Sequence, residues 1–164
     1  MESECRPADD GDLSDIGRVW NRMIGETLST FTTAEKSRSD LTDWIRRQRD
    51  AGRPVLVIRV DGGFGGFATY GPFRSGPGYR HTMEHTILIE DRCQGTGAAR
   101  RLLEALEAEA HRAGVRQLIA VISAENPRAI AFHARAGYAE VARMPGVGFK
   151  WDRWLDLVLM QKAL

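Results

Sequence analysis

The chain has 164 residues, 43% of them hydrophobic and 27% charged, with a formal net charge of +1 at pH 7. This composition is that of a soluble globular protein, and it argues against a dedicated nucleic-acid binder, which needs a strong basic excess. The sequence contains neither a repeat nor an apolar run long enough to cross a bilayer, so we expect one domain over residues 1–164 and no membrane association. The spacing of Cys5 and Cys93 suits neither a metal site nor a disulfide framework, and we expect a cytoplasmic protein without a metal.

Apolar periodicity and turn residues predict helices and strands in alternation along the chain. In the first half they predict a strand ending at residue 7, a helix from Asp9 to about 24, a helix from Ser39 or Asp40 to about 52, and strands at 55–60, 64–70 and 82–89. In the second half they predict a helix from the glycine turn to about 113, a strand at 117–123, a helix from 127 to about 136, and strands at 138–144 and 154–162.

Short-range turn and cap chemistry sets these boundaries. Asp-Gly and Gly-Gly at residues 61–63 supply the positive φ values of a hairpin turn. Asn126, followed by a proline, is typical of a helix N-cap, and Gly137 of a helix end. We expect loops at the Gly- and Pro-rich residues 71–80 and 145–153. The order β-α-α-β-β-β-α-β-α-β-β predicts an α/β fold with one mixed central sheet of about seven strands, flanked by about four helices.

The most distinctive stretch is a glycine-rich turn between the strand at 82–89 and the helix that follows. Such a turn exposes unpaired N–H groups beside the positive end of a helix dipole and can bind phosphate oxygens. The Rossmann pattern fails because Arg100 stands at its third glycine, and the Walker pattern fails because no Gly-Lys-Ser/Thr follows. A plain strand-to-helix connection is the alternative, but Gly95 and Gly97 together with Gln94 favour binding. The pattern Gln/Arg-x-x-Gly-x-Gly/Ala resembles the pyrophosphate loop of the GNAT acyl-CoA N-acetyltransferases.

Further segments narrow this resemblance to the phosphinothricin and methionine-sulfoximine N-acetyltransferases. The segments are Tyr79-Arg80-His81-Thr82-Met83-Glu84-His85-Thr86, Asn126-Pro127-Arg128-Ala129-Ile130-Ala131-Phe132-His133, Met144-Pro145-Gly146-Val147-Gly148-Phe149-Lys150 and Arg153-Trp154-Leu155-Asp156-Leu157. They resemble the family signatures Phe-Arg-x-Thr-Val-Glu-His-Ser, Asn-x-x-Ser-Ile-x-Leu-His, Met-Pro-x-Val-Gly-x-Lys and Arg-Trp-Leu-Asp-Leu. The resemblance implies the GNAT fold, direct acetyl transfer from acetyl-CoA to the α-amine of a small amino-acid-like acceptor, and a homodimer.

The same resemblance implies which residues hold acetyl-CoA. The backbone of the strand before the turn would pair with the pantetheine, the turn would wrap the pyrophosphate, and an asparagine that caps a helix would also contact the cofactor. The residues at these positions are Ile87, Leu88, Ile89, Gln94, Gly95, Thr96, Gly97, Ala98, Ala99, Arg100 and Asn126.

Glu84 is the expected general base. A carboxylate in the middle of an apolar strand is costly to bury unless the protein uses it, and partial burial raises its pKa towards neutrality. The alternative is a salt-bridged or solvent-facing carboxylate. His85 faces the opposite side of the strand, so we expect it to be structural. His133 stands where many GNAT enzymes carry a tyrosine that protonates the thiolate; a packing histidine is its alternative.

An amino-acid acceptor with an anionic or strongly polar tail needs cations and pocket walls. Arg74 and Arg80 flank the expected loop before the catalytic strand, and guanidinium groups bind carboxylate or phosphinate bidentately. Lys150 is a third candidate cation, and Phe31 and Phe73 are candidate walls. Each of these side chains could instead be a solvated surface charge or a core aromatic.

Two other functions fit the same sequence. One is a GNAT enzyme for another amine, such as a peptide N-terminus or a polyamine. The other is an acyl-CoA-binding module without catalysis. The balanced charge indicates no strongly acidic or basic groove for a protein substrate, and the presence of Glu84 argues against a non-catalytic module.

Overall fold

One seven-stranded sheet runs through residues 2–164, the part of the chain that the computed structural model describes. The strand order is β1-β2-β3-β4-β5-β7-β6, with every neighbouring pair antiparallel except β4 and β5, which are parallel. The strands are β1 Ser3–Pro7, β2 Val55–Val60, β3 Gly63–Pro72, β4 Thr82–Ile89, β5 Gln117–Ser123, β6 Ala139–Lys150 and β7 Arg153–Ala163. The α-helices are α1 Leu13–Glu26, α2 Arg38–Asp50, α3 Ala98–Arg112 and α4 Pro127–Arg135. Short 3₁₀ turns are η1 Asp10–Asp12, η2 Pro77–Tyr79 and η3 Asp91–Cys93.

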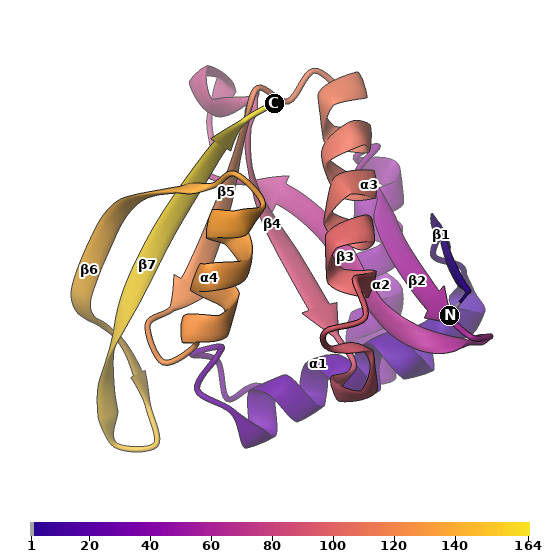
Figure 1. The fold of residues 1–164 in the computed structure, drawn as a ribbon, viewed down its shortest axis with the longest axis horizontal. Helices are drawn as coiled ribbons and strands as arrows, with labels where there is room; N and C mark the ends of the chain where they lie inside the picture. The colour runs from indigo at the N-terminus through magenta and orange to yellow at the C-terminus, as the bar shows by residue number, and fades with distance from the viewer. Residues whose placement is uncertain (1) are drawn as a thin grey trace.

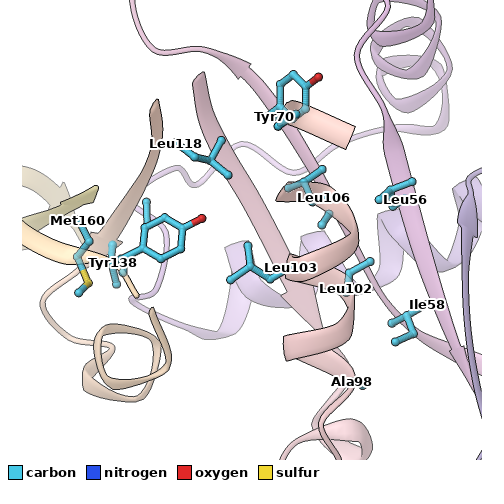
Figure 2. Close-up of a cluster of buried hydrophobic side chains, with 14 of the residues drawn as sticks. Leu56, Ile58, Tyr70, Ala98, Leu102, Leu103, Leu106, Leu118, Tyr138 and Met160 are labelled. Carbon is cyan, nitrogen blue, oxygen red and sulfur yellow. The ribbon is translucent and has the colours of Figure 1, made fainter. Parts of the chain in front are cut away.

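The helices cover both faces of this sheet, as Figure 1 shows. Alternate residues of β2 divide between two cores, because successive side chains of a strand point to opposite faces. Leu56 and Ile58 join the core under α3 and α4, and Val55 and Val57 join the core under α1 and α2. In Figure 2 the apolar side chains of α3 point into the first of these cores; those labelled are Ala98, Leu102, Leu103 and Leu106. No helix among residues 2–164 has the length and apolar character needed to cross a membrane.

The predicted mixed sheet with helices on both faces is confirmed, and three of its strands have the expected bounds. The start of α2 was expected at Ser39 or Asp40 but lies at Arg38. The reason is a capping box: the Ser37 hydroxyl accepts a hydrogen bond from the Asp40 N–H at 3.1 Å, and the Asp40 carboxylate accepts one from the Ser37 N–H at 2.8 Å. Ser37 is therefore the N-cap.

The prediction of a loop at residues 145–153 is also wrong, because β6 continues to Lys150. A register irregularity between Met144 and Gly148 accommodates the Pro-Gly pair within the strand. A proline is tolerated there since β6 is the edge of the sheet. The chain reverses only at Trp151 and Asp152, whose φ values of 52° and 56° are those of a tight two-residue hairpin turn.

The parallel pair at the centre of the sheet separates along its length. β4 and β5 pair from Thr82 opposite Gln117 to His85 opposite Ala120. Beyond that point β4 pairs only with β3, and β5 only with β7. The two strands diverge towards their carboxyl ends in Figure 1. The second half of β4 therefore has one edge without a strand partner.

Candidate active site

A cavity of about 500 Å³ lies where β4 and β5 separate. Its walls come from the second half of α1 and the loop after it, from both strands, from α4 with its N-cap Asn126, and from β7. The lining residues are Trp20, Met23, Ser29, Thr30, Phe31, Thr32, Lys36, Glu84, His85, Thr86, Ile87, Leu88, Ala120, Val121, Ile122, Ser123, Asn126, Ala129, His133 and Leu157. Apart from its two histidines, this lining carries two ionisable groups, the Glu84 carboxylate and the Lys36 ammonium.

Glu84 lies in β4 at the point where the strands begin to separate, between Gly71 of β3 and Ile119 of β5. Its side chain is partly buried, and burial raises the pKa of the carboxyl group above its ordinary value. Within residues 2–164 no hydrogen bond or salt bridge engages this carboxylate. A partly buried carboxylate with a raised pKa and no internal partner has the chemistry of a general base.

His85 points to the other face of β4 and contacts His133 of α4. The Nε2 atoms of the two rings lie 2.9 Å apart. His133 Nδ1 lies 2.8 Å from the Ala129 carbonyl oxygen, which can only accept a hydrogen bond, so Nδ1 carries the proton. In the neutral ring Nε2 of His133 then accepts a hydrogen bond, and His85 Nε2–H donates it. In this assignment His85 Nδ1 is unprotonated, and it is buried without a hydrogen-bond partner in the described structure.

Burial, and secondarily the neighbouring His133, lowers the pKa of His85 to about 3. Burial also lowers the pKa of His133. Both rings are therefore neutral at pH 7. In this arrangement both nitrogens of His133 are engaged, so the ring has no free N–H for a thiolate unless the His85 contact opens.

The glycine turn connects β4 to α3 through η3. Gly95 and Gly97 have φ values of 77° and 85°, which a residue with a Cβ rarely adopts. Gly97 is the N-cap of α3 and has no side chain to bond the first amides of the helix. Ser37 and Asn126, by contrast, bond the first amides of their own helices. The Thr96 hydroxyl accepts a hydrogen bond from the Ala98 N–H at 3.3 Å, and the amides that follow it at the N-terminus of α3 are available to an anion.

The cofactor residues expected from the sequence fall into two groups. Ile87, Leu88 and Asn126 line the cavity. Ile89 packs instead against the core under α3, and the turn from Gln94 to Arg100 lies beyond the cavity, at the start of α3. Asn126 Oδ1 also accepts a hydrogen bond from the Ala129 N–H at 3.1 Å, so its cap role is present in the structure.

The expected acceptor residues are mostly outside the cavity. Phe31 lines it, but Phe73, Arg74 and Arg80 do not. The Arg74 guanidinium lies over the Tyr79 ring at 5.7 Å, and Arg80 Nη1 donates to the Pro77 carbonyl oxygen at 3.4 Å. Lys150 is buried behind the wall that contains Phe31.

Sequence reasoning missed the cation that does line the cavity, Lys36. Asn21 fixes its backbone on both sides: its Oδ1 accepts from the Lys36 N–H at 2.8 Å, and its Nδ2 donates to the Lys36 carbonyl oxygen at 2.9 Å. The ammonium lies 4.3 Å from the centre of the Trp20 ring. Nothing in the local sequence separates this lysine from a surface lysine, because its partners come from α1.

Known proteins resemble the chain over almost its whole length. The profile of the GNAT acetyltransferase family matches residues 20–138. L-methionine sulfoximine/L-methionine sulfone acetyltransferase from Salmonella typhimurium is 35% identical over 97% of this chain and 93% of its own. Phosphinothricin N-acetyltransferase from Alcaligenes faecalis is 31% identical over 94% of this chain and 79% of its own. The structure of an acetyltransferase from Salmonella typhimurium with acetyl-CoA has a TM-score of 0.95 at 34% identity, covering 100% of this chain and 95% of the other.

The fold and the similar proteins indicate the same class of protein, an acetyltransferase. In this chain the parallel strands β4 and β5 separate close to the glycine turn. The chain belongs to the GNAT acetyltransferase family. The resemblance inferred from its motifs is confirmed.

The glycine turn predicts a matched pair of variants at the two ends of α3. Gly97 and Gly114 both have positive φ, 85° and 83°. Gly97→Asp places a carboxylate where phosphate oxygens would approach, and we expect acetyl-CoA affinity to fall by about 1.4 kcal/mol or more, which is tenfold. Gly114→Asp carries the same backbone strain and should bind acetyl-CoA as the wild type does. Calorimetric titration of both variants measures this, and equal affinities would contradict the assignment of the turn.

The buried histidine pair predicts a loss of stability in mild acid. Because the folded pKa of His85 lies far below its unfolded value, the unfolded chain takes up more protons below pH 6.5. The contribution of His85 to the free energy of unfolding is therefore present above pH 6.5 and is lost as the pH drops towards 3. For this one histidine the loss is roughly 2 kcal/mol between pH 7 and 5. His85→Phe should lose that share of the pH dependence. Urea unfolding of both proteins at pH 7 and 5 tests this, and parallel losses would refute it.

Proposed function

We propose that this chain transfers the acetyl group of acetyl-CoA to the α-amine of a small amino acid of the methionine sulfone, methionine sulfoximine or phosphinothricin type. The observation that carries the proposal is the unpartnered, partly buried Glu84 beside the gap between β4 and β5. The relatives named for methionine sulfoximine, methionine sulfone and phosphinothricin support this acceptor class. On this proposal residues 1–164 act as one N-acetyltransferase domain.

Acetyl-CoA supplies the acetyl group as a thioester. The residues of this chain then have three tasks. Glu84 takes a proton from the acceptor ammonium, which frees the nitrogen lone pair for attack. The unpaired edge of β4 after His85 offers backbone N–H groups to the carbonyl oxygen as it gains negative charge. The N-terminus of α3 at Gly97 holds the phosphates. The amine nitrogen attacks the thioester carbonyl carbon, the C–S bond breaks as the tetrahedral intermediate collapses, and CoA leaves as a thiolate that takes up a proton from water.

Lys36 supports an acceptor with one carboxylate. It is the single lysine or arginine among the cavity-lining residues, and it shares the cavity with Glu84. An α-amino acid presents an ammonium for Glu84 and a carboxylate for Lys36. A polyamine would be repelled by Lys36, and a peptide N-terminus has no carboxylate beside its amine. One cation also favours methionine sulfone or sulfoximine over phosphinothricin, which carries a second anionic group.

We also propose that the enzyme is a homodimer that acts in the cytoplasm. Large apolar side chains are exposed on the β6–β7 hairpin. They are Val141, Met144, Val147, Phe149, Trp151 and Trp154, the last being 72% exposed. A second copy of the chain would remove this patch from water. Sedimentation velocity at micromolar concentration tests the assembly, and a monomer would refute it.

The free thiols of Cys5 and Cys93 support a reducing compartment.

Loss of the general base is the first test of this function. Glu84→Gln keeps the shape of the side chain but cannot accept the proton, so turnover of methionine sulfone at pH 7 should fall by about 10²–10⁴-fold. Acetyl-CoA affinity should be unchanged. The deficit should shrink at alkaline pH, where the amine is already neutral. Thiol-release kinetics across pH measure it, and wild-type turnover at pH 7 would assign the base elsewhere.

The role of Lys36 is tested by changing enzyme and acceptor together. Lys36→Met keeps the apolar stem over Trp20 and removes the charge, and a lost charged hydrogen bond costs about 1.5–3 kcal/mol. The KM for methionine sulfone should rise accordingly. With methionine sulfone carboxamide, which lacks the carboxylate, wild type and variant should have similar KM values. An equal rise in the KM for the acid and for the carboxamide would show that Lys36 does not bind the carboxylate.

A further inference from the structure

Lys150, the last residue of β6, is a buried lysine whose three N–H donors are all used within the protein. Its side chain is 1% exposed. The ammonium donates to the carbonyl oxygens of Ile24 at 2.6 Å, Thr27 at 2.6 Å and Thr30 at 3.0 Å. The Ile24 carbonyl belongs to the last turn of α1 and Thr27 is the C-cap residue of that helix, so the cation lies at the end where the helix dipole is negative. The third belongs to the loop that follows α1.

Gly148, two residues earlier in β6, contacts the same loop. A Cβ atom at this position would overlap the ring of Phe31, so the ring lies directly against the strand backbone. Residues two apart in a strand point to the same face. Gly148 and Lys150 therefore hold one segment of the chain, residues 27–31, from one face of one strand.

This segment is a wall of the cavity. Ser29, Thr30 and Phe31 line it, and Lys36 follows in the same loop. Another wall is β4, which carries Glu84. The distance between the base and the loop therefore depends on where the end of β6 holds the loop. The Met-Pro-x-Val-Gly-x-Lys motif contains both holding residues, and neither lines the cavity itself.

We propose that Gly148 and Lys150 are positioning residues for the acceptor: they fix the loop at residues 27–31 and thereby set the size of the acceptor end of the cavity. The proposal rests on the function above, because it takes the Phe31 wall as the acceptor side. Acetyl-CoA binding should not depend on this anchor, since β4 and the turn at Gly97 make no hydrogen bond with Lys150 among residues 2–164. The contacts of Gly148 and Lys150 with the loop, which we call the anchor, should therefore affect binding of the acceptor and not binding of acetyl-CoA.

Lys150→Met tests the anchor, with Lys162→Met as a matched control. Lys162 donates to the Ala136 carbonyl oxygen at 2.9 Å and to Glu107 at 2.7 Å, so it also holds the end of a helix, but away from the acceptor wall. Both variants should lose thermal stability. Lys150→Met should raise the KM for methionine sulfone by about tenfold or more, because a loop that is no longer fixed misplaces the acceptor wall, with the KM for acetyl-CoA unchanged. Lys162→Met should change neither KM.

Gly148→Ala tests the same proposal with the lysine intact. The new methyl group pushes Phe31 into the cavity, so the ratio of kcat/KM for alanine to that for methionine sulfone should rise. A general loss of stability would not move this ratio. The variant also decides the question if Lys150→Met fails to fold: an unchanged ratio overturns the proposal.

Amide hydrogen exchange separates failure of the anchor from failure of the proposed function. Residues 27–31 should exchange faster in Lys150→Met than in Lys162→Met, whatever the acceptor is. Equal exchange there, or an equal rise in the KM for both substrates, overturns the inference. A wild type that acetylates no amino acid, with faster exchange in Lys150→Met, refutes the acceptor assignment and leaves the anchor supported.

Discussion

The separation of β4 from β5 is the constraint on which the rest of the site depends. The strands pair through His85 and Ala120 and then diverge, so the second half of β4 has an edge without a strand partner. Buried backbone groups without partners are costly, and such an edge persists only where a ligand or water can complete it. The parallel pairing also places the α3 connection between the strands, which brings the open helix N-terminus at Gly97 close to the carboxyl end of β4.

Charge is sparse in this cavity, and each charge has a distinct position. Glu84 is partly buried without a partner, which raises its pKa and keeps it able to exchange a proton. Lys36 is held by its backbone rather than by a carboxylate, so its ammonium remains available to an anion. The histidine pair contributes no charge at neutral pH because its members are buried against each other. An acceptor with one ammonium and one carboxylate complements this pattern.

The sequence predicted the sheet well because short apolar runs between turn residues define β2, β4 and β5 with little ambiguity. It failed where local signals conflicted with position in the sheet. Proline and glycine after Met144 indicate a loop, but an edge strand accommodates them as an irregularity. The glycine turn and Glu84 were identifiable because their chemistry is local. Lys36 was not identified, and Lys150 was named as an acceptor cation although its ammonium is buried against α1 and the loop after it. The partners of both lysines come from distant parts of the chain.

On the proposed function, the two halves of the reaction fall to different regions of the chain. The family profile ends at residue 138, after β4, the glycine turn, α3, β5 and α4, which form the gap and the anion site. The β6 strand and its turn lie beyond that match, yet Gly148 and Lys150 contact the loop whose Phe31 lines the cavity. An acceptor wall anchored outside the elements that bind the shared co-substrate can change its shape without disturbing acetyl-CoA. On the proposed function, this separation explains how similar folds can act on different amines.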